Sequence, residues 1–368
     1  MPIISPAGSW LKSRTGIVAG GLLTLTLGTI ASISLYMQND SIELQGTAAD
    51  SDTPYSSAWQ RVSANFSMDH HVDDPRVQQW ITWYQEHPRM FADYAKTSAP
   101  WMHYVVRQVE ARGLPGEVAL LPFVESGYNP YARSPKGPSG MWQLATATAS
   151  DMGLDNRVGY LARQDVVAST RAALDYLEMM NHQWYHGDWD STLAAYNAGP
   201  GRVNLARVQS GTQDFWKTAL PEETRNYVPK LLALAEIVSH PQKYGIDLQH
   251  VADKPSFDVI SLDHSLDLAS AARLAGIDVS ELKLYNPAYI GNWTGDTLLV
   301  PTSVGKHFKN ELARVKNGDT QLQYVVNQGD TLSTISQRAG IPVKRIEQDN
   351  QLDGKSIKVG QTLMLASA

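Results

Sequence analysis

The sequence contains no cysteine, so neither a disulfide framework nor a cysteine-borne lipid anchor is available to the protein. Basic residues are in modest supply, because 31 Lys and Arg face 37 Asp and Glu and are scattered along the chain. A net charge of −6 without a basic cluster argues against nucleic acid as a partner. Phenylalanine is also scarce, with 6 residues against 16 Tyr and 10 Trp. These amphipathic aromatics suit the wall of a wet groove as well as a core.

One long stretch near the N-terminus has no charge at all. It runs from Thr15 to Asn39 and follows Lys12 and Arg14. Its length is sufficient to cross a hydrocarbon core of about 30 Å. We therefore interpret residues 1–40 as an export segment, which is either a retained membrane anchor, favoured by its length, or a cleaved signal peptide. The preceding positive charges place the rest of the chain outside the cytoplasm.

The next two segments differ sharply in pattern. Residues 41–72 are rich in Ser, Asp, Ala and Thr and have little apolar periodicity, which is typical of a linker. From Pro75 onwards, apolar and aromatic residues recur at helical spacing. We expect a mostly helical domain over residues 73–242.

The last third of the chain contains two copies of a small module, at 256–303 and 322–366. Each copy has the apolar pattern of strand, helix, helix and strand. An Ala-Gly-Ile-x-Val run occurs at Ala275 and again at Ala339, as expected of a diverged repeat. The upstream copy is the more diverged, because it lacks the Gly-Asp-Thr-Leu run that begins at Gly329.

A short apolar helix is predicted to end at Glu125. Pro115 suits its first position, and Gly127 stops its last turn. This position disfavours an ionised carboxylate, because desolvation and the negative end of the helix dipole act together. We therefore expect a raised pKa for Glu125. A carboxyl group that is protonated near neutral pH can act as the general acid that cleaves an acetal.

Four motifs occur together in the predicted helical domain. They are Glu125-Ser-Gly, Gly140-Met-Trp-Gln143, Ala195-Tyr-Asn-Ala-Gly199 and Glu223-Thr-Arg-Asn-Tyr-Val228. In this order and spacing they resemble the soluble lytic transglycosylase domain, over about residues 75–240. The segment from Tyr324 to Leu365 resembles the LysM module. The resemblance implies a mainly α, lysozyme-like (α+β) catalytic domain, followed by one or two small βααβ LysM modules.

The resemblance also implies an activity and a set of site residues. The activity is that of a peptidoglycan lytic transglycosylase, which cleaves the β-1,4 bond between N-acetylmuramic acid and N-acetylglucosamine. It forms a 1,6-anhydromuramyl product and needs neither a metal nor another cofactor. By position, Glu125 is the acid and base of the reaction. The implied substrate-binding residues are Ser126, Ser134, Gln143, Tyr196, Asn197, Glu223 and Tyr227. The implied glycan-binding residues of the LysM module are Gly329, Asp330, Thr331, Leu332 and Asn350.

The implied partners follow from the same resemblance and from the export segment. They are the glycan strands of peptidoglycan and, through the N-terminal segment, a membrane. The expected location is the periplasm, with the protein anchored in the inner membrane or released after signal cleavage. Protein partners are not indicated by the sequence.

Two other functions remain open at the level of the sequence. In a hydrolytic muramidase a second acid, such as Asp151 or Asp155, would position a water molecule. A non-catalytic wall-binding scaffold would need only the LysM modules. A metal site is not expected, although His182 and His186 have ligand spacing, because Gln183 stands where a zinc protease has its Glu base.

Several of the implied site residues also have a purely structural interpretation. Ser126 can make local hydrogen bonds at a helix end. Ser134 and Gln143 lie among Pro and Gly and can stabilise a loop. Glu223 suits the first turn of a helix, where an acid interacts favourably with the helix dipole. The sequence does not decide between these roles.

Overall fold

The computed structural model describes residues 55–352 and 356–365. The predicted export segment, residues 1–40, and the start of the predicted linker lie outside these residues. Within the described part of the chain, no helix combines the length and the apolar character that a bilayer span requires.

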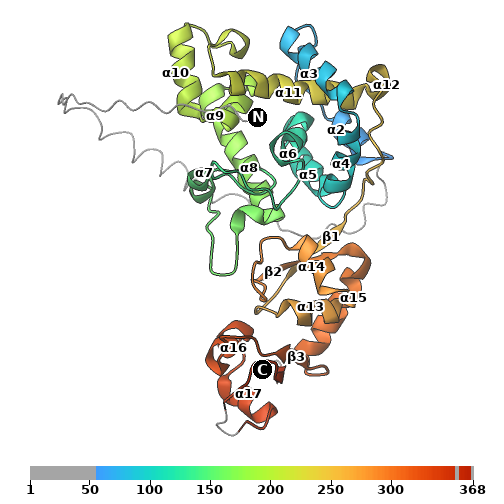
Figure 1. The fold of residues 1–368 in the computed structure, drawn as a ribbon, viewed down its shortest axis with the longest axis vertical. Helices are drawn as coiled ribbons and strands as arrows, with labels where there is room; N and C mark the ends of the chain where they lie inside the picture. Colours follow the sequence, from blue (N-terminus) through green and yellow to red (C-terminus); the bar gives the residue numbers. More distant parts are fainter. Residues whose placement is uncertain (1–54, 353–355, 366–368) are drawn as a thin grey trace, which may run out of the picture. The chain divides into compact units, whose positions relative to one another are not determined.

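A helical domain occupies the first part of the described chain (Figure 1). Its α-helices are α2 (Ala58–Ala64), α3 (Pro75–Glu86), α4 (Arg89–Ser98), α5 (Met102–Ala111), α6 (Leu121–Ser126), α7 (Thr146–Asp151), α8 (Val166–Met180), α9 (Trp189–Ala198), α10 (Pro200–Ser210), α11 (Glu222–Ser239) and α12 (Pro241–Tyr244). Short 3-10 segments are η1 (Gly116–Leu120), η2 (Ala162–Gln164) and η4 (Phe215–Lys217), and η3 (Asn181–Tyr185) is a π-helix. The prediction of a mainly α catalytic domain is confirmed.

Local signals in the sequence set the ends of the helices that carry the site motifs. Helix α9 begins after Asp188, whose side chain accepts a hydrogen bond from the Ser191 amide at 3.1 Å. Helix α6 ends at Gly127, which has a left-handed conformation with φ 63°. The last turns of both helices therefore fall where the sequence predicts them, and they carry Glu125 and Tyr196.

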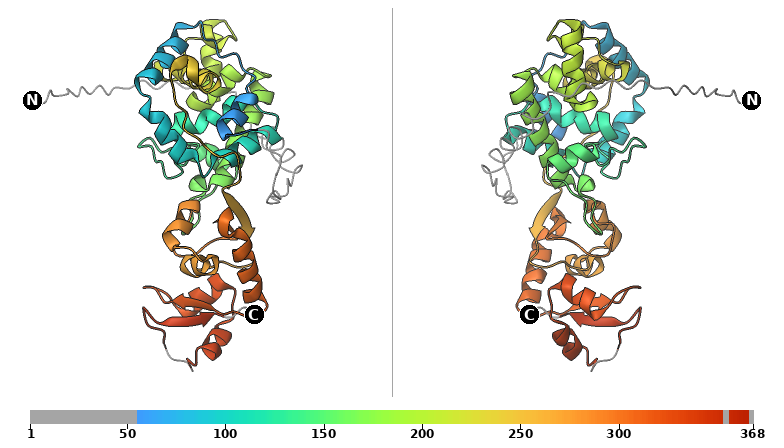
Figure 2. Two further views of the ribbon diagram at one scale, coloured as in Figure 1. Left: turned by 90° about the vertical axis from the view of Figure 1, so that its right-hand side faces the viewer. Right: turned by 90° about the vertical axis from the view of Figure 1, so that its left-hand side faces the viewer.

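Helix α11 forms much of the core of this domain. It crosses the domain between α3 and α9 and packs against both of them (Figures 1 and 2). Its fully buried apolar residues include Val228, Leu231, Leu232, Leu234 and Ile237. Because α11 also packs against η1 and α6, it brings its first turns to the helix that ends in Glu125.

The structure corrects the predicted linker over 41–72. Helix α2 lies within that range and buries Trp59 and Val62 in the core of the helical domain. Its Arg61 forms ion pairs with Asp253 at 2.8 Å and with Glu110 at 3.1 Å. These partners are distant in the sequence, so no local pattern reveals them. The packed domain therefore begins before residue 73 and extends past residue 242 to Asp253.

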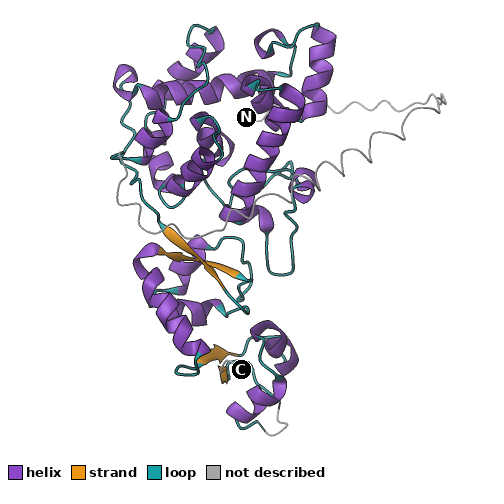
Figure 3. Ribbon diagram, turned by 180° about the vertical axis from the view of Figure 1, so that it is seen from behind, coloured by secondary structure: helices purple, strands orange, loops and turns teal. Residues whose placement is uncertain are grey.

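The two C-terminal modules contain the named strands of the described residues (Figure 3). The first module consists of β1 (Phe257–Ser261), α13 (Leu268–Ala275), α14 (Val279–Tyr285), β2 (Thr297–Pro301) and α15 (Thr302–Lys316). The second consists of β3 (Leu322–Val325), α16 (Leu332–Ala339), α17 (Val343–Asp349) and β4 (Thr362–Leu365). Both strand pairs are antiparallel. The predicted order of strand, helix, helix and strand is confirmed in both copies, whereas α15 was not predicted.

An asparagine has the same structural role in both modules. The Asn286 side chain donates to the Leu299 carbonyl at 2.7 Å and accepts from the Leu299 amide at 2.9 Å. The Asn350 side chain does the same with Met364, at 2.8 Å and 2.7 Å. Each asparagine thereby ties the end of the second helix to the last strand. Equal bonds at matching positions identify the first module as a diverged copy of the second.

Candidate active site

Glu125 lies on the last turn of α6 and faces the first turns of α11. The Tyr227 hydroxyl of α11 donates a hydrogen bond to Glu125 Oε1. Burial raises the pKa of Glu125 to about 7, and the Tyr227 hydrogen bond opposes this rise only in part. The predicted rise of the pKa is confirmed, with desolvation as its principal cause. Among the described residues, no cation forms an ion pair with Glu125.

Helix α9 brings a second tyrosine to the same place. The Tyr196 hydroxyl donates to the Trp142 carbonyl at 2.7 Å. Burial, together with the nearby Glu125 carboxylate, raises the pKa of Tyr196 well above its usual range. Asn197 follows it and is half-buried. The structure thus brings together Glu125, Tyr196 and Tyr227, which come from three different helices.

The loop of residues 132–144 is attached to α6 by Ser126. The Ser126 hydroxyl donates to the Met141 carbonyl at 2.7 Å. Gln143 has a left-handed backbone with φ 49°, and its Nε2 donates to the Gly140 carbonyl at 2.7 Å. Both side chains therefore stabilise the backbone beside Glu125, which is the structural role that the sequence left open for them.

Close packing holds this loop against the segment before α8. Gly140 has φ 83°, and a Cβ atom at this position would lie 1.8 Å from the Arg163 carbonyl oxygen. Trp142 is fully buried, and its Nε1 donates to the Thr170 hydroxyl at 2.9 Å. The Gly-Met-Trp-Gln motif therefore has steric reasons for its glycine and tryptophan, in addition to any contact with substrate.

Two further predicted substrate-binding residues, Ser134 and Glu223, interact with Lys136. The Ser134 hydroxyl accepts a hydrogen bond from the Lys136 amide at 3.2 Å. The Glu223 side chain is 71% exposed and pairs with Lys136 at 3.5 Å. An exposed pair of this kind contributes little to stability. Glu223 therefore remains accessible to a ligand, and its negative charge raises the pKa of Glu125.

Two carboxylates close in the sequence to His182 and His186 are used elsewhere. Asp188 pairs with Arg207, and Asp190 accepts a hydrogen bond from Trp216 Nε1 at 2.7 Å. His186 has a left-handed backbone with φ 50° at the end of η3. Over residues 55–352 and 356–365, no cluster of His, Asp and Glu has the arrangement of a metal site.

In the second module the predicted glycan-binding residues lie at two turns. Gly329 has φ 87°, and Thr331 caps α16 through a bond from the Thr334 amide at 3.1 Å. The Asp330 carboxylate accepts from the Tyr324 hydroxyl and from the Asn327 amide. Asn350 uses both ends of its amide for backbone bonds, so a structural role accounts for it without a glycan.

We expect Asn350→Ala to destabilise the second module by about 2 kcal/mol, because it leaves the Met364 amide and carbonyl without their partner. Thermal unfolding, monitored through hydrogen exchange at the β4 amides, measures this loss of stability. As a control, Gln348→Ala removes an amide side chain near the end of α17 that has neither of these bonds. Weakened glycan binding by Asn350→Ala at full stability would instead show that Asn350 contacts the glycan.

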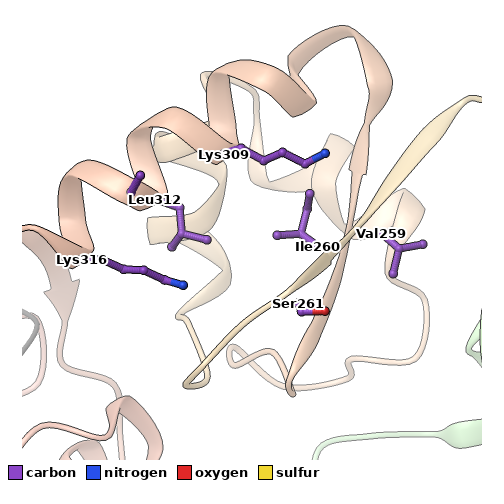
Figure 4. A pocket seen from close by; sticks show the side chains of 7 residues that line it. Val259, Ile260, Ser261, Lys309, Leu312 and Lys316 are labelled. Carbon is purple, nitrogen blue, oxygen red and sulfur yellow. The ribbon is translucent and has the colours of Figure 1, made fainter. Parts of the chain in front are cut away.

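A hollow of about 280 Å³ lies in the first module, between β1 and α15 (Figure 4). Its lining includes Ile260, Lys309 and Lys316, and none of the candidate site residues. Lys309 pairs with Asp258 at 3.3 Å, and Lys316 pairs with Asp263 at 2.7 Å. Both positive charges are therefore compensated within the module.

Sequence reasoning missed one charged residue near Glu125. Lys230 follows Tyr227 by three positions on α11, and its charge lowers the pKa of Glu125. Helical spacing from Tyr227 is a signal that could have identified it.

Comparison with known proteins matches three segments of the chain to family models. The transglycosylase SLT domain matches residues 106–219, the LysM domain matches 324–365, and the LysM-like domain of lytic transglycosylase MltD matches 256–317. Membrane-bound lytic murein transglycosylase D of Escherichia coli (strain K12) is 32% identical over 389 residues, which cover 97% of this chain and 85% of the relative.

More distant similarities cover only part of the chain. Membrane-bound lytic murein transglycosylase F of Photobacterium profundum is 33% identical over 114 residues, which cover 27% of this chain and 20% of that protein. The crystal structure of the 70 kDa soluble lytic transglycosylase of Escherichia coli is 21% identical, with a TM-score of 0.36, over 45% of this chain and 30% of that one.

The protein is thus a peptidoglycan lytic transglycosylase with a lysozyme-like catalytic domain and C-terminal LysM-type modules. Within this class, the chain belongs to the family of membrane-bound lytic murein transglycosylase D.

Proposed function

We propose that Glu125 is the single acid and base of this transglycosylase, and that the bond cleaved is the β-1,4 bond between N-acetylmuramic acid and N-acetylglucosamine. The supporting observation is that burial raises the pKa of Glu125 to about 7. A carboxyl group with this pKa holds its proton near neutral pH and can still release it. The Tyr227 hydroxyl orients the carboxyl group by its hydrogen bond.

The reaction needs two proton transfers, both of which involve Glu125. In the first step the Glu125 carboxyl protonates the glycosidic oxygen, and the bond between that oxygen and C1 of the muramyl residue breaks. In the second step the muramyl C6 hydroxyl attacks C1 and gives its proton to the Glu125 carboxylate. No water is consumed, and Glu125 returns to its starting state. The products are a 1,6-anhydromuramyl end and a free N-acetylglucosamine end.

The geometry favours this reaction over hydrolysis by two carboxylates. Asp151 and Asp155 are exposed, and Asp155 accepts a hydrogen bond from the Ser150 hydroxyl at 2.9 Å. The carboxylate whose charge acts on Glu125 is that of Glu223, which is 71% exposed at the start of α11. We therefore assign no water-activating acid to the site, and we place Glu223 among the residues that contact the strand.

We further propose where the enzyme works and how it is held there. The LysM module at 322–366 binds N-acetylglucosamine-containing strands through its β3–α16 turn, which includes Gly329, Asp330, Thr331 and Leu332. The cellular location is the periplasm, in agreement with the membrane-bound murein transglycosylase that the chain resembles. The N-terminal segment, residues 1–40, anchors the protein in the inner membrane through its uncharged stretch from Thr15 to Asn39.

Digestion of purified sacculi in water enriched in oxygen-18 tests the reaction. Mass spectrometry should find 1,6-anhydromuramyl ends that carry no oxygen-18, because water does not enter the product. Reducing muramyl ends with one oxygen-18 atom would show hydrolysis and overturn the proposal. Binding of sacculi without any cleavage would instead identify a wall-binding scaffold.

We expect Tyr227→Phe to lower kcat about tenfold, because the bond to the Glu125 carboxylate is lost. The same bond lowers the pKa of Glu125, so its loss should move the alkaline limb of the pH profile to higher pH. Rates of anhydromuramyl release between pH 5 and 9 measure both effects. A profile identical to that of the parent enzyme would remove Tyr227 from the site.

A further inference from the structure

Helix α11 presents one more charged side chain to the site than the reaction scheme uses. Glu223, Tyr227 and Lys230 are spaced by four and three residues, so they lie along one face of the helix. Lys230 is half-buried, and its backbone carbonyl accepts a hydrogen bond from the Tyr84 hydroxyl of α3 at 3.4 Å. This bond holds this part of α11 against α3.

The Lys230 ammonium group has an aromatic neighbour, and no described carboxylate lies within ion-pair distance of it. Its Nζ lies 5.3 Å from the ring centroid of Trp80 on α3. No ion pair of Lys230 is found over residues 55–352 and 356–365. Other enclosed cations of the helical domain differ, since Arg61, Arg112 and Arg207 each pair with a carboxylate. An enclosed charge without a partner is costly, and such charges cluster at functional sites.

The groups that act on Glu125 come from two helices. From α11, Tyr227 donates a hydrogen bond to Glu125, and the charges of Glu223 and Lys230 act on its pKa. From α9, Tyr196 has its own pKa raised by burial and by the Glu125 carboxylate. Glu223 raises the pKa of Glu125, and Lys230 lowers it. The interaction is mutual, because the charge of Glu125 raises the pKa of Lys230 against the effect of burial. Lys230 is thus the cation of this group.

We propose that Lys230 is a positioning residue of the reaction, whose ammonium group stabilises the Glu125 carboxylate between the two proton transfers. The inference rests on the proposed role of Glu125. When the proton has passed to the leaving sugar, the carboxylate remains in an enclosed site that disfavours its charge. The ammonium on the same face of α11 compensates that charge, and Trp80 keeps it in place without neutralising it.

The test compares Lys230→Met with Lys230→Arg in the full chain. Release of 1,6-anhydromuramyl ends from sacculi is measured between pH 5 and 9. We expect Lys230→Met to lower kcat about tenfold with KM within twofold, and to move the alkaline limb about one pH unit upwards. Lys230→Arg keeps the positive charge, so its alkaline limb should lie at the same pH as that of the parent enzyme. Lys96→Met, which removes an exposed charge from α4, serves as the matched control and should match the parent enzyme.

Other outcomes distinguish a failure of the role of Lys230 from a failure of the proposed function. If Lys230→Met raises KM and leaves the pH profile in place, the ammonium binds a carboxylate of the substrate instead, and the inference is overturned. An unchanged rate and profile overturn it as well. If Glu125→Gln retains activity, the proposed function itself fails. If Glu125→Gln is inactive and Lys230→Met keeps the pH profile of the parent enzyme, only the role of Lys230 is refuted.

Discussion

Glu125→Gln is expected to reduce the release of anhydromuramyl products at least about a thousandfold, because the amide can neither donate nor accept the transferred proton. The parent enzyme should lose activity as the pH rises through about 7, where Glu125 gives up its proton. The substitution keeps the size of the side chain, so binding of sacculi should persist. Product chromatography and a sedimentation assay on the same preparation measure the two properties.

The stability of the same variant provides a control for folding. Burial raises the pKa of Glu125 from its ordinary value of 4.5 to about 7, so the folded state binds the proton more tightly than the unfolded chain. Ionisation therefore destabilises the native state as the pH rises across this range. Glu125→Gln should melt at a higher temperature than the parent at pH 8, and the gain should vanish below about pH 4, where both states of the parent hold the proton. A variant with parental activity would refute the catalytic assignment.

Gly140→Ala is expected to destabilise the protein by about 3–5 kcal/mol, which is large for the addition of one methyl group. The new Cβ atom would lie 1.8 Å from the Arg163 carbonyl oxygen, and φ 83° is unfavourable for alanine. The oxygen belongs to the backbone, so the loop itself must move. Because Trp142 and Gln143 follow in the same loop, activity should fall more than the folded fraction does. Urea unfolding and kcat measured on folded protein test the two effects.

Gly153→Ala is the matched control for this substitution. Gly153 has φ 74°, but no atom lies within 4 Å of an added Cβ. Its substitution should therefore cost only the backbone strain, about 1–2 kcal/mol, and leave kcat unchanged. Equal losses of stability at both positions would show that the contact with Arg163 is not the cause.

Local chemistry made the ends of the catalytic helices predictable. Asp188 caps α9, and Gly127 ends α6, so the positions of Tyr196 and Glu125 on last turns could be inferred from the sequence. The repeat in the tail was equally visible, because an Ala-Gly-Ile-x-Val run begins at Ala275 and again at Ala339. Helix α15 was missed, since most of its residues are polar and only Gly305, Phe308 and Val315 are buried.

The features that the sequence did not predict depend on contacts between residues that are distant in the chain. The predicted linker contains α2, which is held by core packing of Trp59 and Val62 and by the ion pair of Arg61 with the distant Asp253. The roles of Ser126 and Gln143 could not be chosen from the sequence, because only the folded loop shows that they bond to backbone carbonyls. Lys230 acquires its influence on the pKa of Glu125 through the packing of α11 against α6.

The sequence by itself determined the kinds of chemistry available, because helix caps, glycine stops and motif spacing are local properties of the chain. It placed an acid at the end of an apolar helix and predicted the raised pKa. Only the tertiary structure decided which groups surround that acid, since Tyr196, Tyr227 and Lys230 come from helices that meet through core packing. The burial of Glu125 and the electrostatic effect on its pKa depend on all of these neighbours together. No local sequence pattern encodes their combined effect.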